Sequence, residues 1–140
     1  MKIISWSKMA EGNKKSHKIL IVDDEPFNCR ILKLKLENAG YKVVTASNGE
    51  EGLSKFMVEC PDVVISDIRM PRMNGYEMCK YIKEVSNGRP YLTIVITSTV
   101  EKRERSFVNK TENAVLLEKP ISPGHLLTIV EDYLNKPSFV

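Results

Sequence analysis

Acidic, hydroxyl and basic residues stand at the ends of short apolar segments, where together they could carry phosphoryl chemistry. They are Asp23, Asp24 and Glu25 after segment 18–22, Asp67 after 62–66, Thr97 and Ser98 at the end of 92–97, and Lys119 after 114–117. Converging carboxylates repel one another, and a hard divalent cation such as Mg²⁺ offsets that repulsion. With the cation bound, one aspartate can attack phosphorus while a lysine and a threonine hydroxyl stabilise the phosphoryl oxygens. The set indicates a phosphoryl-transfer site, although each residue taken alone is more typical of a turn or a solvated surface.

Five segments rich in β-branched and other apolar residues are predicted to be strands. They cover residues 18–22, 41–46, 62–66, 92–97 and 114–117, and three of them are continuous apolar runs, as in strands covered on both faces. Helix signals lie between them. This alternation predicts an α/β fold with a five-stranded, parallel, doubly wound sheet of the flavodoxin-like (βα)5 type. Such sheets bind their ligands at the carboxyl ends of the strands, where the polar residues stand.

The helices between the strands have recognisable start and stop residues. Pro26 is expected to start a helix that Gly40 ends in a left-handed conformation, and Asn48 is expected to cap the next helix. Residues 31–36 alternate apolar and polar side chains as a strand does, but the flanking proline and glycine favour a helix. A helix at 101–108 has few apolar anchors. Its charged cluster 102–105 is predicted to be a solvated face, the alternative being that it helps to choose a partner or a dimer mate. Asn113 is expected to make a left-handed turn, and the last helix covers 123–134.

The composition is that of one globular domain: 140 residues, of which 42 % are hydrophobic and 28 % charged. The net charge of +3 divides unevenly, because the first 18 residues hold five lysines and one glutamate, a charge of +4, and the rest of the chain carries −1. We therefore predict a basic flexible leader over 1–17, a domain over 18–136 and a short tail over 137–140, with no direct nucleic-acid partner. No apolar run is long enough for a membrane span or a signal peptide, which predicts no membrane insertion and a cytoplasmic protein. The three cysteines and two histidines form no disulfide or zinc pattern.

Four motifs carry a resemblance to a known family. They are IVDDEP over residues 21–26, SDIRMPRMNGY over 66–76, ITS over 96–98 and EKP over 118–120. Their key residues are spaced by 43, 30 and 22 positions, from Asp24 to Asp67, to Thr97 and to Lys119. The chain from Lys18 to Lys136 resembles the receiver domain of two-component response regulators, the fold of the bacterial chemotaxis response regulator.

The resemblance implies a metal-assisted phosphoacceptor. Asp67 would accept a phosphoryl group from a phosphohistidine on a sensor histidine kinase or a phosphotransfer domain. Asp24 and Asp67 would bind Mg²⁺ directly, together with the backbone carbonyl of Arg69. Asp23 would act on the metal largely through bound water.

The resemblance also implies which groups contact the phosphoryl oxygens. Thr97 would move toward the phosphoryl group, and Lys119 would pair with it. The backbone amides of Ile68 and Ser98 would complete the phosphate cradle. The bond before Pro120 would be cis, which is reasonable for a proline in a tight turn.

One position departs from the family pattern. The aromatic residue that the family usually has three positions before the lysine is Leu116 here, so an aromatic rotamer switch is not available. We expect Thr97 still to move and the signal to be read through residues 98–113, a weakly anchored segment of the kind that moves in switches. The alternative is that Leu116 simply packs and switching is weak.

Several functions are compatible with the chemistry but not equally with the sequence. A receiver would catalyse only its own phosphorylation and dephosphorylation, and it would act through an unidentified downstream protein or a homodimer formed on phosphorylation. The main alternative is an aspartate-nucleophile phosphatase for small molecules. Such enzymes place two aspartates two residues apart after the first strand and need a cap insertion, and this sequence has neither. Nucleotide or flavin binding would require a phosphate-binding loop rich in Gly, Ser or Thr after the first strand, where this chain has Asp23-Asp24-Glu25-Pro26.

Overall fold

The computed structural model describes residues 17–135 and contains one five-stranded sheet. The strands are β1 (Lys18–Val22), β2 (Lys42–Ala46), β3 (Val63–Asp67), β4 (Leu92–Thr97) and β5 (Ala114–Glu118). All neighbours are parallel, and the spatial order is β2-β1-β3-β4-β5. The predicted fold class is confirmed, and β2 lies at one edge of the sheet. The predicted leader and tail lie outside the described residues, apart from His17.

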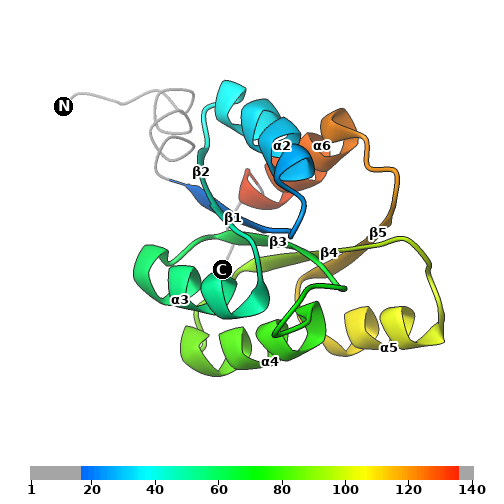
Figure 1. The fold of residues 1–140 in the computed structure, drawn as a ribbon. Coiled ribbons are helices and arrows are strands. Elements are labelled where there is room, and N and C mark those ends of the chain that lie inside the picture. The colour runs from blue at the N-terminus through cyan, green and yellow to red at the C-terminus, as the bar shows by residue number, and fades with distance from the viewer. Residues whose placement is uncertain (1–16, 136–140) are drawn as a thin grey trace.

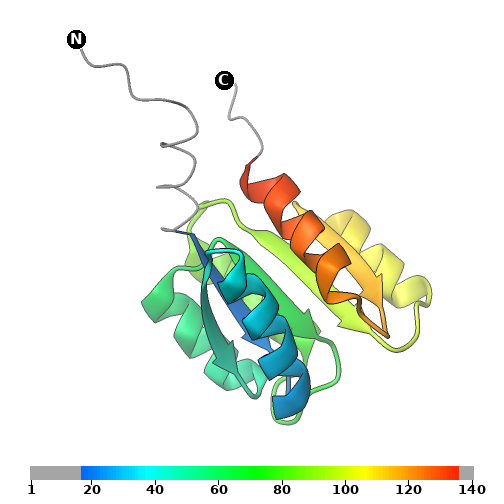
Figure 2. The same cartoon turned by 90° about the horizontal axis from the view of Figure 1, so that it is seen from above.

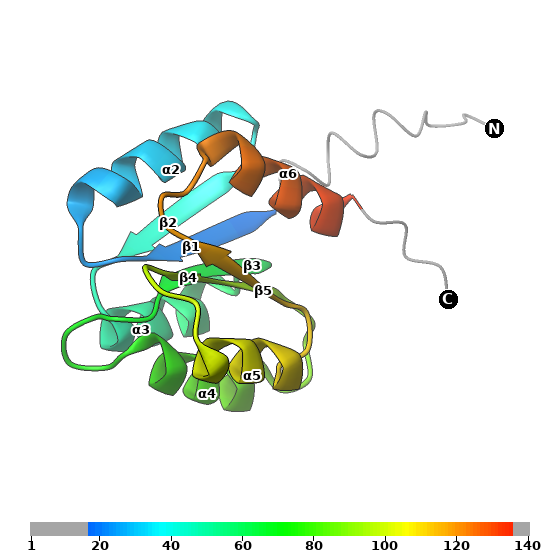
Figure 3. The same ribbon diagram turned by 90° about the vertical axis from the view of Figure 1, so that its right-hand side faces the viewer.

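Within residues 17–135, five helices cover the two faces of the sheet (Figures 1 and 3). They are α2 (Pro26–Asn38), α3 (Gly49–Glu59), α4 (Gly75–Ser86), α5 (Lys102–Lys110) and α6 (Pro123–Leu134). Helices α2 and α6 lie side by side on one face, as the view from above shows, and α3, α4 and α5 lie on the other (Figure 2). Each face has its own apolar core, because alternate side chains of every strand point to opposite faces. None of the helices in the described part of the chain has the length and apolar content that a bilayer crossing needs.

Local sequence signals account for most helix boundaries. The Asn48 side chain accepts a hydrogen bond from the Glu51 amide at 2.9 Å, as predicted for a helix cap. Asn74 and Glu77 form a capping box at the start of α4, immediately after the loop that follows β3. Gly40 and Asn113 both have the predicted positive φ, at 100° and 52°. These caps set the points at which the chain leaves and re-enters the sheet.

Two segments show how packing decides between local patterns. Residues 31–36 are helical within α2, and the buried side chains are Leu32 and Leu36, one helical turn apart, rather than every second residue. Ile31 and Leu34 remain exposed. Helix α5 is short, as expected, but its one buried side chain is that of Glu104, so the prediction of a solvated charged face is wrong at this residue.

Glycines allow α3 and the loop after β3 to approach closely. A Cβ atom on Gly49 would collide with the backbone carbonyl oxygen of Met73, and one on Gly52 would lie 2.7 Å from the sulfur of Met78. A Cβ on Gly75 would lie 2.6 Å from the carbonyl oxygen of Asp67. The loop between β3 and α4 is therefore held between β3 and the first turn of α3.

Gly49→Ala is expected to lower the free energy of unfolding by about 1–3 kcal/mol, because the backbone of Met73 must move to admit the methyl group. Gly124→Ala is the matched control, since this glycine also lies in the first turn of a helix. Its Cβ would meet only the Ser122 hydroxyl, at 3.9 Å. The change should therefore raise the free energy of unfolding by about 0.4–1 kcal/mol, because alanine lowers the conformational entropy of the unfolded chain. Urea unfolding of both variants checks the pair, and equal effects would contradict the packing argument.

Candidate functional site

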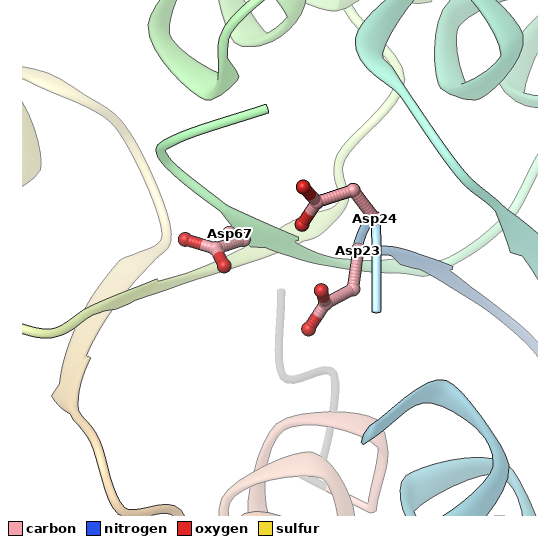
Figure 4. Close-up of side chains that lie close together, drawn as sticks. All are labelled: Asp23, Asp24 and Asp67. Atoms are coloured by element: carbon pink, nitrogen blue, oxygen red, sulfur yellow. The ribbon is translucent and has the colours of Figure 1, made fainter. Parts of the chain in front are cut away.

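Three carboxylates meet at the carboxyl edge of the sheet (Figure 4). Asp23 and Asp24 follow β1, and Asp67 is the last residue of the neighbouring strand β3 rather than the residue beyond it. One carboxylate oxygen from each residue lies within 4.8 Å of the others. Asp23 and Asp67 are buried, whereas Asp24 is exposed. The structure thus brings together the three aspartates that the sequence placed at strand ends.

Asp23 is a buried acid with two acidic neighbours. Its side chain is 6 % exposed, and its Oδ1 accepts a hydrogen bond from the Glu25 amide at 2.9 Å. Burial raises the pKa of Asp23 above the usual value of 3.8, and the negative charges of Asp67 and Asp24 raise it further, against the opposing effects of the Glu25 amide and Lys119. A positive charge placed among these carboxylates would therefore be bound favourably.

Lys119 supplies one positive charge to the site. Its Nζ lies 2.8 Å from Oδ2 of Asp67, and this hydrogen bond is the main cause that raises the pKa of the lysine above 10.5. The Lys119 amide donates to the carbonyl oxygen of Thr97 at 2.8 Å, which continues the pairing of β4 with β5 past the end of the strand. The bond to Pro120 is cis, as expected. Lys119 remains paired with Asp67 and partly open to solvent.

Thr97 is buried at the end of β4, and its hydroxyl points into the loop that follows. The hydroxyl donates to the carbonyl oxygen of Thr99 at 2.8 Å and accepts from the Thr99 amide at 3.2 Å. Thr97 therefore stabilises the turn that leads toward α5. To contact a group on Asp67 the hydroxyl must give up its bond to the Thr99 carbonyl.

The backbone amides around Asp67 differ from the expected arrangement. The Ile68 amide donates to the carbonyl oxygen of Ile96 at 3.2 Å, so the neighbouring strand already uses the amide expected to bind phosphate. The Arg69 amide instead faces the Asp67 side chain and donates to its Oδ1 at 3.3 Å. The reason is that β3 continues to pair with β4 through Asp67, which directs the Ile68 amide sideways into the sheet.

Leu116 lies in β5, opposite Val95 of β4, and is half-buried. Its strand neighbours Val115 and Leu117 pack against the core under α2 and α6. Because side chains alternate along a strand, Leu116 lies on the opposite face of the sheet, where α5 contacts β5. An aromatic residue does stand near the site, but it is Tyr76 at the start of α4.

A cleft of about 500 Å³ opens beside the carboxylates, between the loop after β3 and the start of α5. Its lining includes Asp24, Arg69 and Thr97 from the predicted site, together with Tyr76, Arg103 and Glu104, which sequence reasoning did not assign to it. The spacing of Glu101 and Glu104 matches a capping box and was the one signal that pointed to a fixed position for Glu104. Nothing local indicated that Glu104 would meet Tyr76, 28 residues away.

The donor set fits a hard divalent cation. All three side chains offer carboxylate oxygens, the ligands that Mg²⁺ and Ca²⁺ prefer. Two of these carboxylates are buried, and Lys119 is paired with one of them. No histidine or cysteine belongs to this group of ligand atoms in the described residues. A carboxylate that lies between other acids and a lysine can, with a divalent cation bound, act as a nucleophile toward phosphorus.

Comparisons with known proteins agree with this arrangement. The family model described as the response regulator receiver domain matches residues 19–131. The probable transcriptional regulator ycf27 of Guillardia theta is 40 % identical over 125 residues, which make up 87 % of this chain and 48 % of that protein. This chain spans about half the length of several curated relatives that it matches, including those of Cyanophora paradoxa and Bacillus subtilis.

Solved structures share both sequence and fold with the chain. A receiver domain protein described as CheY-like, from Methanospirillum hungatei, is 30 % identical with a TM-score of 0.77, and the match covers 86 % of this chain and 94 % of that one. A chain of the CheX-CheY complex with BeF₃ and Mg²⁺ from Borrelia burgdorferi is 26 % identical with a TM-score of 0.74, covering 84 % and 88 %. With the sheet order, the acidic cluster and the paired lysine in place, the chain belongs to the family of response regulator receiver domains.

Proposed function

We propose that this receiver domain is phosphorylated on Asp67 and that the modification changes which protein it binds. The observation that carries the proposal is the position of the Asp67 carboxylate, which lies among two other carboxylates and 2.8 Å from Lys119. The only chemistry proposed for the domain is its own phosphorylation and dephosphorylation. We further propose that the domain acts in two-component signalling in the cytoplasm, and its membership of the receiver family supports this.

The transfer step needs little from the protein beyond position and charge. A carboxylate oxygen of Asp67 forms a bond to phosphorus, and the bond between phosphorus and the donor imidazole nitrogen breaks. The electron pair of the broken bond stays on the imidazole nitrogen. A proton from solvent then gives the neutral histidine side chain. An aspartate that is already ionised requires no general base.

The residues that would hold Mg²⁺ are Asp24, Asp67 and the backbone carbonyl of Arg69, with Asp23 acting through bound water. When bound, the ion offsets the negative charge of the carboxylates and of the phosphoryl oxygens. Lys119 is proposed to stay paired with Asp67 when the phosphoryl group is present. The backbone amides of Arg69 and Ser98 are proposed to donate to the phosphoryl oxygens. The Arg69 amide takes the place first expected for Ile68, because it already donates to Asp67.

The switch is proposed to run through Thr97 and residues 98–113. A phosphoryl group on Asp67 offers the Thr97 hydroxyl a charged acceptor, which competes with the carbonyl oxygen of Thr99. The segment after Thr97 leads directly into α5, the helix with the fewest apolar anchors. Leu116, half-buried beneath this region, packs without the rotamer switch of an aromatic residue.

A protein donor, rather than a small molecule alone, is supported by the surface beside the site. A cleft next to Asp23 and Lys119 is lined by apolar side chains of α2 and of the segment before α6, including Ile31 and Ile121. On the same helix, Phe27 is 68 % exposed and Leu34 is 59 % exposed. A phosphohistidine carried on a helical protein could reach Asp67 across this apolar surface. We therefore propose a sensor histidine kinase or a phosphotransfer domain as the donor.

Acetyl phosphate with Mg²⁺, followed by intact mass measurement, tests the proposal without a cognate kinase. One phosphoryl adduct per chain is expected in the presence of Mg²⁺, and none in the presence of a chelator. Gel filtration of the same mixtures distinguishes a phosphorylated monomer from a phosphorylated homodimer. Absence of the adduct under all metal conditions would overturn the proposed function.

A further inference from the structure

A contact between Tyr76 and Glu104 joins α4 to α5. The Tyr76 hydroxyl donates to Oε2 of Glu104 at 2.6 Å. The Tyr76 ring packs edge-on against Phe107, with 5.0 Å between ring centroids, and the guanidinium carbon of Arg103 lies 4.4 Å from the Tyr76 centroid. Three side chains of α5 thus converge on one side chain of α4. Glu104, at 8 % exposure, is the buried member of α5.

The Glu104 carboxylate has two partners that tie different parts of the molecule together. Oε2 accepts from Tyr76, and Oε1 accepts from the backbone amide of Glu101, the residue that precedes α5, at 3.1 Å. The same carboxylate therefore fixes the first turn of α5 and attaches that turn to α4. Hydrogen bonds to a charged acceptor are stronger than those between neutral groups, so this junction is well suited to hold α5 in one position.

Both helices joined by the Tyr76–Glu104 contact are connected to the site around Asp67, α4 on one side of the contact and α5 on the other. On one side, the Gly75 amide next to Tyr76 donates to the carbonyl oxygen of Ile68 at 2.8 Å, and the Gly75 Cα approaches the Asp67 backbone too closely for a side chain. This side is rigidly attached to β3. On the other side, the Thr97 hydroxyl holds the Thr99 carbonyl, two residues before Glu101. This side depends on a hydrogen bond that a modified Asp67 would compete for.

We infer that the Tyr76–Glu104 hydrogen bond is a latch that holds α5 in the unphosphorylated position, and that Tyr76 is the positioning residue of the switch. The inference rests on the proposed phosphorylation of Asp67. When the Thr97 hydroxyl turns toward a phosphoryl group, the Thr99 carbonyl loses its donor and segment 98–101 rearranges. The Glu101 amide moves with this segment and draws Glu104 away from Tyr76, which is fixed to β3. Helix α5 is then released to bind a partner.

Linkage gives the latch a measurable consequence. A bond present only in the unphosphorylated state opposes binding of any ligand that favours the other state, so removing the bond must strengthen that binding. Tyr76→Phe deletes the hydroxyl and keeps the ring packed on Phe107. We expect it to raise the affinity for beryllofluoride, measured by calorimetry with Mg²⁺ present, by about three- to tenfold. Amide exchange over residues 99–110 should also rise before beryllofluoride is added.

Tyr81→Phe is the matched control, because Tyr81 is an exposed tyrosine on the same helix and should leave affinity and exchange unchanged. Glu104→Gln retains one acceptor oxygen and should strengthen binding as Tyr76→Phe does, without an additive effect in the double variant. If the wild-type protein does not bind beryllofluoride, the proposed function itself fails. If it binds and Tyr76→Phe binds with equal or lower affinity, the latch is overturned, even where exchange has increased.

Discussion

Asp67→Asn is expected to leave no phosphoryl adduct after incubation with acetyl phosphate and Mg²⁺. The amide oxygen of asparagine can still accept the hydrogen bond from Arg69, so the local backbone should be retained. What is lost is the anionic oxygen that attacks phosphorus and the partner of Lys119. Intact mass gives the readout, and circular dichroism checks that the variant is folded.

The matched control for this variant is Asp132→Asn, which makes the same change at an exposed position on α6. It should be phosphorylated as fully as the wild-type protein. An adduct that persists in Asp67→Asn would place the acceptor elsewhere and would falsify the site assignment. Because the control has lost the same formal charge, a shared loss of the adduct would point to net charge rather than to the acceptor.

Asp23→Asn is expected to act in opposite directions on stability and on metal binding. Burial raises the pKa of Asp23 in the folded protein, so between 3.8 and that raised value the folded state holds more protons than the unfolded state. The free energy of unfolding therefore falls as the pH rises through this window, and above it the full cost of keeping Asp23 ionised in the folded protein is present. At pH 7 without metal, the asparagine variant should be more stable by about 1–3 kcal/mol, because it removes a buried charge and keeps an acceptor for the Glu25 amide.

Urea unfolding between pH 4 and pH 7 checks this prediction, since the variant should have a flatter profile than the wild-type protein over the acidic window. In a Mg²⁺ titration the same variant should bind the ion about 10- to 100-fold more weakly, as is typical when a group that orients metal ligands is removed. Glu25→Gln removes a neighbouring exposed charge that does not belong to the acidic cluster and should change both quantities little. Lower metal-free stability of Asp23→Asn, or unchanged Mg²⁺ affinity, would contradict the prediction.

Much of the fold and the composition of the site could be predicted from local patterns. Continuous apolar runs marked the buried strands, and Asn48 and Gly40 marked helix ends, because capping and backbone conformation depend on a few neighbouring residues. The meeting of Asp23, Asp24 and Asp67 was also predictable, since parallel strands bring their carboxyl ends to one edge. Sequence alone therefore determined the sheet, its acidic edge and the residue types found there.

Only the tertiary structure decided which partners those residues have. The charged segment 102–105 contained no local sign that Glu104 would be buried, because its hydrogen bond to Tyr76 depends on how α4 and α5 pack on the sheet. The length of the β3–β4 pairing likewise decided which backbone amide contacts Asp67. The Ile68 amide bonds to Ile96 in β4, whereas the Arg69 amide donates to the Asp67 side chain. Local patterns report interactions over a helical turn or a strand pair, whereas the contacts of Tyr76 with Glu104 and of Ile68 with Ile96 join residues far apart in the sequence, and their geometry exists only once the chain has folded.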